Sequence, residues 1–118
     1  MLVNLSNHTC DTWDEKQRIA AINYGEVIDF PFPYVNPSAS KEDVSELATT
    51  IVCAVTKVNP SAVLCQGEST LAFSVVTKLK EAGFKVLAAC SERNVTQETQ
   101  RDRTIKRIDF DFVCFREY

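Results

Sequence analysis

The chain of 118 residues contains only three glycines and one histidine, and it has no Cys-x-x-Cys pair. The shortage of glycine excludes the G-x-G-x-x-G fingerprint, so we do not expect NAD binding. No apolar run approaches the roughly 18 to 20 residues needed to cross a bilayer. The amino terminus lacks the basic, apolar and small-residue order of a signal peptide. We therefore expect one globular domain, residues 1–118, without membrane contact.

The five cysteines form an odd-numbered set without the spacing of a metal site. Cys53, Cys65 and Cys114 have apolar neighbours in the sequence, which is typical of reduced, buried thiols in a cytoplasmic protein. A metal held by Cys10 and His8 would need further ligands, and none is evident. We therefore expect no metal and no cofactor.

Charge is distributed unevenly along the chain. The formal net charge of −3 argues against a general binder of duplex nucleic acid, because such proteins are usually basic. Residues 1–92 carry a net charge of −4, whereas residues 93–107 carry +3. A local basic segment on an acidic body favours a specific anionic ligand over DNA, although an ordinary solvated loop explains any one of these charges equally well.

Hydrophobic patterning predicts five strands. Four of them are short apolar runs at residues 2–5, 27–30, 62–65 and 85–90. Residues 107–115 alternate with period two, as an edge strand does, except that Phe115 is out of step. Residues 94–105 are polar and lack apolar periodicity, so we expect a mobile loop or a frayed helix there.

Three helices are predicted between the strands. Thr12 and Glu15 have capping-box spacing, which predicts a helix over residues 13–24 that ends at Gly25. A second helix opens at Ser40, carries an apolar stripe and ends at Asn59-Pro60. A third follows Gly67, with Ser69 or Thr70 as its cap, and ends before Gly83.

The order β-α-β-α-β-α-β-β predicts a three-layer, Rossmann-like α/β fold with a mainly parallel sheet and a C-terminal antiparallel edge strand. In the flavodoxin-like strand order 2-1-3-4-5, the first and third strands meet at the topological switch point, where ligands bind. Right-handed crossovers place the loops after the strands at one edge of the sheet. Three polar clusters should therefore converge, and they are Ser6-Asn7-His8, Gln66-Gly67-Glu68-Ser69-Thr70 and Ser91-Glu92-Arg93.

Two of these residues are candidates for proton transfer or nucleophilic chemistry. His8 is the only histidine, and its side chain is suited to proton transfer at neutral pH. The alternative is a surface histidine that braces the loop. Glu68 could accept a hydrogen bond from a ribose hydroxyl or act as a base, but a carboxylate at a helix start also stabilises the helix dipole.

The remaining candidates are ligand contacts. Arg93 offers a fork for phosphate, or else an ion pair with Glu92. Gln66 and Asn7 can hydrogen-bond a base or a sugar, although amides also brace turns. A strand that turns directly into a helix presents free N–H groups, which suit a phosphate or carboxylate.

Several of these segments resemble those of one protein family. The loop Ser6-Asn7-His8, the helix start Gln66–Thr70, the strand end Cys90–Arg93 and the closing residues 115–118 are similar to segments of small stand-alone CRISPR-associated proteins of type III systems, which are Rossmann-like. The resemblance implies a homodimer that binds a cyclic oligoadenylate second messenger. It places ligand or catalytic residues at Ser6, Asn7, His8, Gly67, Glu68, Ser69, Thr70 and Arg93.

The resemblance also implies two possible activities, since some relatives cleave the ring without a metal and others only sequester it. In the first case His8 would transfer a proton while the ribose 2′-hydroxyl attacks its own phosphate. In the second case the protein is a non-catalytic sensor or sponge. A third alternative is a nucleoside-processing hydrolase or transferase with Glu68 as the nucleophile.

Overall fold

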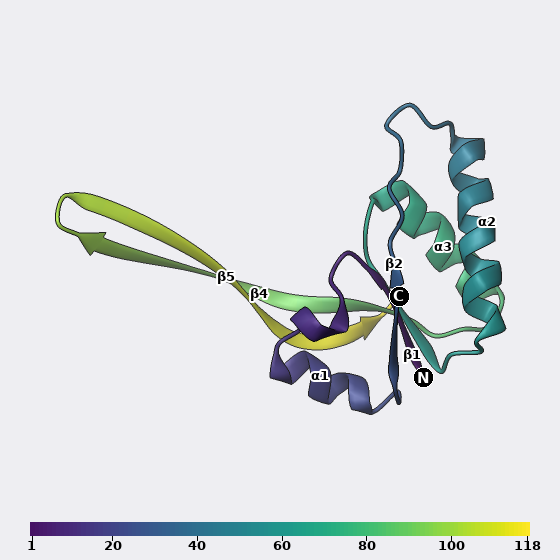
Figure 1. Cartoon of the computed structure of the whole chain (residues 1–118), viewed down its shortest axis with the longest axis horizontal. Coiled ribbons are helices and arrows are strands. Elements are labelled where there is room, and N and C mark those ends of the chain that lie inside the picture. Colours follow the sequence, from purple (N-terminus) through teal and green to yellow (C-terminus); the bar gives the residue numbers. More distant parts are fainter.

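The computed structural model describes residues 1–118 and contains one five-stranded sheet in the order β2-β1-β3-β4-β5 (Figure 1). The first four strands in chain order pair in parallel, and β5 pairs antiparallel with β4 at the edge. The predicted strand order and the antiparallel edge are therefore confirmed. The strands are β1 (Leu2–Ser6), β2 (Val27–Pro31), β3 (Ala62–Cys65), β4 (Val86–Gln100) and β5 (Arg103–Glu117).

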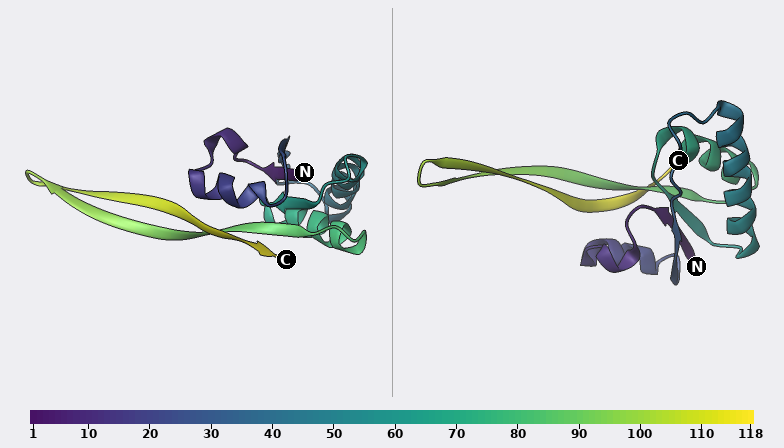
Figure 2. Two further views of the ribbon diagram at one scale, coloured as in Figure 1. Left: turned by 90° about the horizontal axis from the view of Figure 1, so that it is seen from below. Right: turned by 45° about the horizontal axis from the view of Figure 1, so that its top comes forward.

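Helices cover both faces of the sheet, which makes the three predicted layers. The helix α1 (Glu15–Ile22) lies on one face, and α2 (Lys41–Lys57) and α3 (Ser69–Glu81) pack side by side on the other (Figure 2). Leu2 and Leu64 belong to the core on the α1 side, whereas Val3 and Val63 belong to the core under α2 and α3. Successive strand residues point to opposite faces, so β3 is apolar on both faces, and β1 is too except at Asn4 and Ser6.

The first helix begins later than the capping box at Thr12 predicts. It is preceded by the short 3-10 turn η1 (Cys10–Thr12), and its N-cap is Asp14, whose carboxylate accepts a hydrogen bond from the Gln17 N–H at 2.8 Å. Trp13 is extended and buried, with its indole in the core on the α1 side. Burial of this large ring outweighs the local capping preference, because a buried aromatic contributes more than a cap does.

The other two helices have side-chain caps at their starts. In α2 the predicted start at Ser40 is confirmed, and Ser40 and Asp43 form a reciprocal capping box with distances of 3.0 and 3.1 Å. In α3 the prediction of Ser69 or Thr70 is wrong by one or two residues, because Glu68 is the N-cap. A carboxylate has two acceptor oxygens, so it satisfies two backbone donors where a hydroxyl satisfies one.

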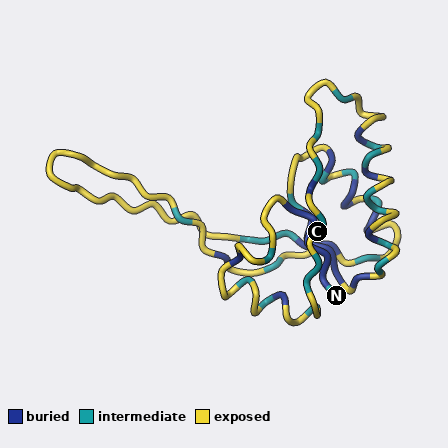
Figure 3. Tube along the Cα trace, in the orientation of Figure 1, coloured by how far each residue is buried: buried dark blue, intermediate teal, exposed yellow.

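Residues 94–105 form neither the mobile loop nor the frayed helix expected from the sequence. They continue β4 and β5 into a long hairpin that turns at Arg101 and Asp102 and extends away from the rest of the molecule (Figure 1). We call residues 91–112 the arm. Every residue of β4 from Ser91 to Gln100 is exposed (Figure 3), so no buried face imposes the alternation that identifies a strand.

A β-bulge at the base of the arm explains why Phe115 is out of step. Cys90 is opposite Cys114 while Ser91 is opposite Phe112, which leaves Val113 as an extra residue in β5. The bulge therefore turns Phe112 and Phe115 toward the same face, where their ring centroids are 5.0 Å apart. Phe115 also packs edge-on against Trp13 and Tyr24.

The cysteines are free, but only one of the three predicted buried thiols is buried. Cys65 at the end of β3 is inaccessible, whereas Cys53 and Cys114 are exposed. Cys53 lies on the outer side of α2, and Cys114 lies on the edge strand next to the bulge. The prediction was therefore wrong for these two, because apolar neighbours in sequence do not place a residue on the inner face. None of the helices is both long and apolar enough to cross a membrane.

We expect the exposed thiols to be alkylated in the folded protein and Cys65 to be protected. Burial raises the pKa of the Cys65 thiol from an ordinary 9.0 to about 12. As the pH rises above 9 the unfolded chain loses this proton first, so the stability present at lower pH declines toward pH 12. Iodoacetamide labelling of the folded protein, read by peptide mass spectrometry, tests the protection of Cys65. Alkylation of Cys65 at the rate of Cys53 without urea would contradict it.

Candidate functional site

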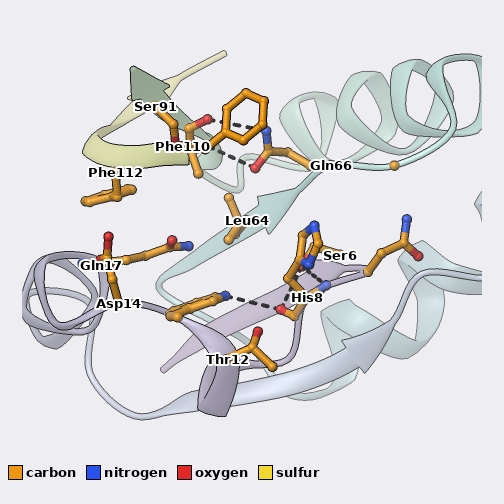
Figure 4. Close-up of a pocket in the computed structure, with 14 residues that line it drawn as sticks. Ser6, His8, Thr12, Asp14, Gln17, Leu64, Gln66, Ser91, Phe110 and Phe112 are labelled. Carbon is orange, nitrogen blue, oxygen red and sulfur yellow. Dashed lines mark hydrogen bonds between the residues drawn. The ribbon is translucent and has the colours of Figure 1, made fainter. Parts of the chain in front are cut away.

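A crevice of about 810 Å³ lies at the carboxyl edge of the parallel strands, on the α1 side of the sheet (Figure 4). Its walls come from the loops after β1 and β3, the start of α1 and the base of the arm. Its lining residues are Ser6, Asn7, His8, Thr12, Trp13, Asp14, Gln17, Leu64, Gln66, Gly67, Ala89, Ser91, Phe110 and Phe112. This is the switch point of the sheet, where doubly wound folds bind ligands.

Six of the ten residues predicted for the site line this crevice, and four do not. Those in the crevice are Ser6, Asn7, His8, Gln66, Gly67 and Ser91. Glu68 and Arg93 lie outside its lining, and Ser69 and Thr70 instead border a groove between α2 and α3. The loops after β1 and β3 thus meet as expected, but the turn after Gly67 carries the next residues to the opposite side of the sheet.

The loop that carries His8 is held by a buried asparagine in β1. Asn4 is only 1% exposed. Its amide nitrogen donates to the His8 carbonyl and to Asp29, both at 2.8 Å, and its oxygen accepts from the Ser6 hydroxyl at 2.7 Å. The Trp13 indole N–H also donates to the His8 carbonyl, at 3.1 Å. The backbone of His8 is therefore fixed from two directions, while its imidazole is left exposed at the crevice.

Gln66 extends the sheet with its side chain. β3 ends at Cys65, and the Gln66 amide then pairs with the backbone of Ala89 in β4, accepting from its N–H at 3.1 Å and donating to its carbonyl at 3.4 Å. An amide has two donors and two lone pairs, so one donor and one acceptor site remain for a ligand. These two hydrogen bonds, drawn as dashed lines in Figure 4, fix the orientation of the amide in the wall of the crevice.

Gly67 makes the turn from β3 into α3 under the ring of Phe32. A Cβ atom on Gly67 would lie 2.5 Å from two ring carbons of Phe32, which is far inside contact distance. Phe32 is itself 8% exposed and belongs to the core under α2 and α3. A residue without a side chain is therefore required here by the close approach of the ring.

Glu68 caps α3 and does not face the crevice. Its carboxylate accepts hydrogen bonds from the backbone N–H of Thr70 at 3.0 Å and of Leu71 at 2.8 Å, and from the Thr70 hydroxyl. These hydrogen bonds lower the pKa of the Glu68 carboxyl below its ordinary value, and the bond from the Thr70 hydroxyl contributes most. The same N–H groups that a phosphate would need are thus already occupied.

The arm contributes two aromatic rings that the sequence did not single out as site residues. Phe112 is buried where it lines the crevice, whereas Phe110, which lines it too, is 68% exposed. Arg93 is directly opposite Phe110 in the hairpin, so the two side chains share a face. The alternation of Ile108, Phe110 and Phe112 was visible in the sequence, but only the bulge shows which way these residues point.

Asn4 and Trp13 were also missed as determinants of the site. The available signal was the single polar residue in the otherwise apolar run Leu2–Leu5, because a buried amide must find partners nearby. Asp14 is the one lining residue whose carboxylate borders the crevice, and it is engaged as the cap of α1. No group of three or more His, Cys, Asp or Glu side chains is arranged to hold a metal ion.

Strand order and crevice together define a Rossmann-like α/β protein with a ligand-sized cleft at the switch point of its sheet. A family model described as "Uncharacterized protein MJ1673 family" matches residues 1–116, and the chain belongs to that family. A search of curated proteins found no match.

We expect Asn4→Leu to destabilise the protein. Leucine preserves the buried volume but removes one of the two acceptors of the Ser6 hydroxyl, and it removes a donor from the His8 carbonyl and from Asp29. Loss of these three hydrogen bonds should lower the free energy of unfolding by about 1 to 3 kcal/mol, measured by urea denaturation. Asn7→Ala, at an exposed position nearby, is the control and should change stability by less than about 0.5 kcal/mol. Equal stability of the two variants would show that the Asn4 hydrogen bonds do not support the loop.

Gly67→Ala should also be destabilising, by about 1 to 3 kcal/mol, because the new methyl group overlaps the Phe32 ring. The cause is tested by a double-mutant cycle with Phe32→Leu, which removes the ring. The two substitutions together should cost less than the sum of their separate costs. Additive costs would show that the restriction at Gly67 comes from its backbone and not from Phe32.

Proposed function

We propose that the crevice binds a cyclic oligoadenylate, the ligand implied by the resemblance to small CRISPR-associated proteins of type III systems. The observation that carries the proposal is the convergence of amide side chains, an imidazole and aromatic rings on one cleft at the switch point. These are the groups that recognise a nucleobase, by hydrogen bonds to its edge and by stacking on its face.

In this proposal an adenine enters between Gln66 and Phe110. The free donor and acceptor of the Gln66 amide suit the edge of adenine, which presents an amino donor next to a ring nitrogen acceptor. Phe110 presents an exposed aromatic face at the mouth of the crevice. Stacking on such a ring contributes about 1 to 3 kcal/mol per base.

The phosphate lies toward the arm, because the crevice itself has no Lys or Arg in its lining. Arg93 shares a face with Phe110 and is the nearest cation along that face of β4. A guanidinium forms two parallel hydrogen bonds with a phosphate. The proposal therefore retains Arg93 as the phosphate contact, on the arm outside the lining of the crevice.

Cleavage, where it occurs, would use His8. The imidazole takes the proton of a ribose 2′-hydroxyl as that oxygen attacks the adjacent phosphorus, and the bond from phosphorus to the 5′-oxygen breaks. The protonated imidazole then returns the proton to the 5′-oxygen, which leaves a 2′,3′-cyclic phosphate and a 5′-hydroxyl. A two-fold dimer would present two such histidines to one ring.

Binding without cleavage is the second candidate function. It is favoured by the scarcity of free ionisable groups in the crevice, where the Asp14 carboxylate caps α1 and His8 is the one titratable group without such a role. A hydrolase or transferase with Glu68 as nucleophile has less support, because the Glu68 carboxylate is held by backbone N–H groups outside the crevice.

Incubation with cyclic oligoadenylates of several ring sizes, followed by mass spectrometry, separates these functions. A linear product with a 2′,3′-cyclic phosphate supports cleavage, and unchanged ring retained by the protein supports sequestration. If neither is seen for any ring size, the proposed ligand is wrong.

We expect His8→Ala to slow cleavage by at least about a hundredfold while binding is retained, as loss of a general acid–base does.

Phe110→Ala should weaken binding by about 1 to 3 kcal/mol through loss of stacking. Tyr34→Ala is the matched control, because Tyr34 is an aromatic residue of similar exposure, at 81%, that does not line the crevice. An equal loss of affinity in both variants would rule out a specific contact with Phe110.

A further inference from the structure

Two of the five cysteines are directly opposite each other at the base of the arm. Cys90 on β4 is paired with Cys114 on β5, immediately before the bulge. Residues that are directly opposite each other in an antiparallel pair share a face of the sheet, so the two thiols lie side by side. Cys114 is exposed and Cys90 is half-buried. A small molecule in solution can therefore reach this pair.

The backbone geometry at this pair matches that of a disulfide. The Gln66 amide occupies the N–H and the carbonyl of Ala89, so Ala89 turns its backbone groups away from β5, and the next residue, Cys90, turns them toward β5. Two residues that exchange backbone hydrogen bonds in this way have their Cα atoms about 5.5 Å apart. Disulfides most often join Cα atoms that are about 5.5 to 6 Å apart. The strands therefore need no change of register to bring the sulfurs together.

The Cβ atoms need only a small further approach. In an antiparallel pair they are about 4.5 to 5.5 Å apart, and a disulfide brings them to about 3.5 to 4.5 Å. The bulge at Val113 interrupts the ladder next to Cys114, so β5 can adjust at this point. A bond that requires such an adjustment is easier to reduce than a structural disulfide, which is typical of regulatory disulfides.

Cys65 is the third cysteine of the sheet, and it does not compete for either thiol. Its side chain is buried, and burial raises its pKa to about 12, so it forms little of the reactive thiolate. It also follows Leu64, which is opposite Leu87, so it lies one strand across from Cys90 and two residues behind it. This offset separates the two Cα atoms by about 8 Å, beyond the roughly 7 Å that a disulfide can span.

We propose that Cys90 and Cys114 form a reversible disulfide across the base of the arm, with a small disulfide in solution as the oxidant. The bond closes a loop of residues 91–113, which contains the whole arm. Ser91 and Phe112, at the inner end of the arm, line the crevice. The crosslink therefore restrains an exposed two-stranded hairpin, which is marginally stable alone, at the point where it joins the crevice wall. The pairing does not depend on the proposed ligand.

Two thiol–disulfide exchange steps form the bond. The thiolate of the exposed Cys114 attacks one sulfur of the small disulfide, forms a mixed disulfide and releases the other sulfur as a thiolate. The Cys90 thiolate then attacks the Cys114 Sγ and releases the second thiolate. The two released thiolates take up the two protons that the cysteines lose, and two electrons pass from the cysteine pair to the small disulfide. A dithiol reductant reverses both steps.

Treatment of the full chain with oxidised glutathione tests the pairing. Free thiols are then blocked with iodoacetamide, and the protein is digested with trypsin without reductant. The five cysteines lie in five different tryptic peptides, so mass spectrometry distinguishes every pairing. We expect peptide 86–93 to be linked to peptide 108–116 in most molecules, and dithiothreitol should release both. Cys53 is the matched control thiol, because it is exposed on α2 and should carry only a glutathione adduct.

The variant Cys114→Ser should leave no linked peptide that contains Cys90. In the wild type, separate glutathione adducts on Cys90 and Cys114, a link from either of them to another cysteine, or reaction at Cys53 alone would overturn the pairing. An equal yield of the link in urea would also overturn it, because the register of the folded strands would then play no part.

Hydrogen exchange tests the effect on the arm. Amides of residues 94–105 should exchange at least about tenfold more slowly in the oxidised protein than after reduction, because the closed loop limits opening of the hairpin. The double variant Cys90→Ser/Cys114→Ser, treated with oxidised glutathione, should exchange as the reduced protein does. Equal exchange in the oxidised and reduced wild type would overturn the proposed restraint of the arm. Failure of cyclic oligoadenylate to bind would leave both results unaffected.

Discussion

A single buried amide in the first strand is the constraint on which the crevice depends. A polar group enclosed in an apolar layer must be hydrogen-bonded, and Asn4 meets this requirement by drawing in the backbone of His8 and the side chains of Ser6 and Asp29. The loop after β1 is thereby folded back over its own strand. Trp13, which donates to the same carbonyl, then determines where α1 starts. One residue inside the sheet therefore positions a loop, a helix and a candidate catalytic group.

The architecture could be read from the sequence because β3 and most of β1 are apolar on both faces and alternate with amphipathic helices. Those patterns depend on burial, and burial is what periodicity reports. The helix starts were less predictable. In α1 the cap is Asp14 and not Thr12, because the Trp13 ring between them is buried in the core. In α3 the cap is Glu68 and not Ser69, because the Glu68 carboxylate reaches two N–H groups. Local capping rules rank the candidates, but tertiary packing selects among them.

The arm escaped prediction for the opposite physical reason. It is a sheet with no interior, so its sequence has no hydrophobic alternation along most of its length, and its turn contains Arg101 in a left-handed conformation and no glycine. Half of the crevice was predictable, because the loops after parallel strands must meet at one edge. The aromatic half, Phe110 and Phe112, depended on an antiparallel pairing that the polar stretch concealed.

The extra residue Val113 reconciles the spacing of two phenylalanines with the alternation of β5. Phe112 and Phe115 are three positions apart, which in a regular strand places side chains on opposite faces, and the bulge absorbs the odd residue so that both rings lie on one face. Deleting Val113 would leave Phe112 opposite Ser91 and Cys114 opposite Cys90, so the arm would keep its pairing without a bulge. A slip of one residue that paired Val113 with Ser91 would instead bring Asp111 and Asp109 onto the crevice face and turn Phe110 and Phe112 away. The bulge therefore decides whether the hairpin presents aromatic or acidic side chains at the crevice.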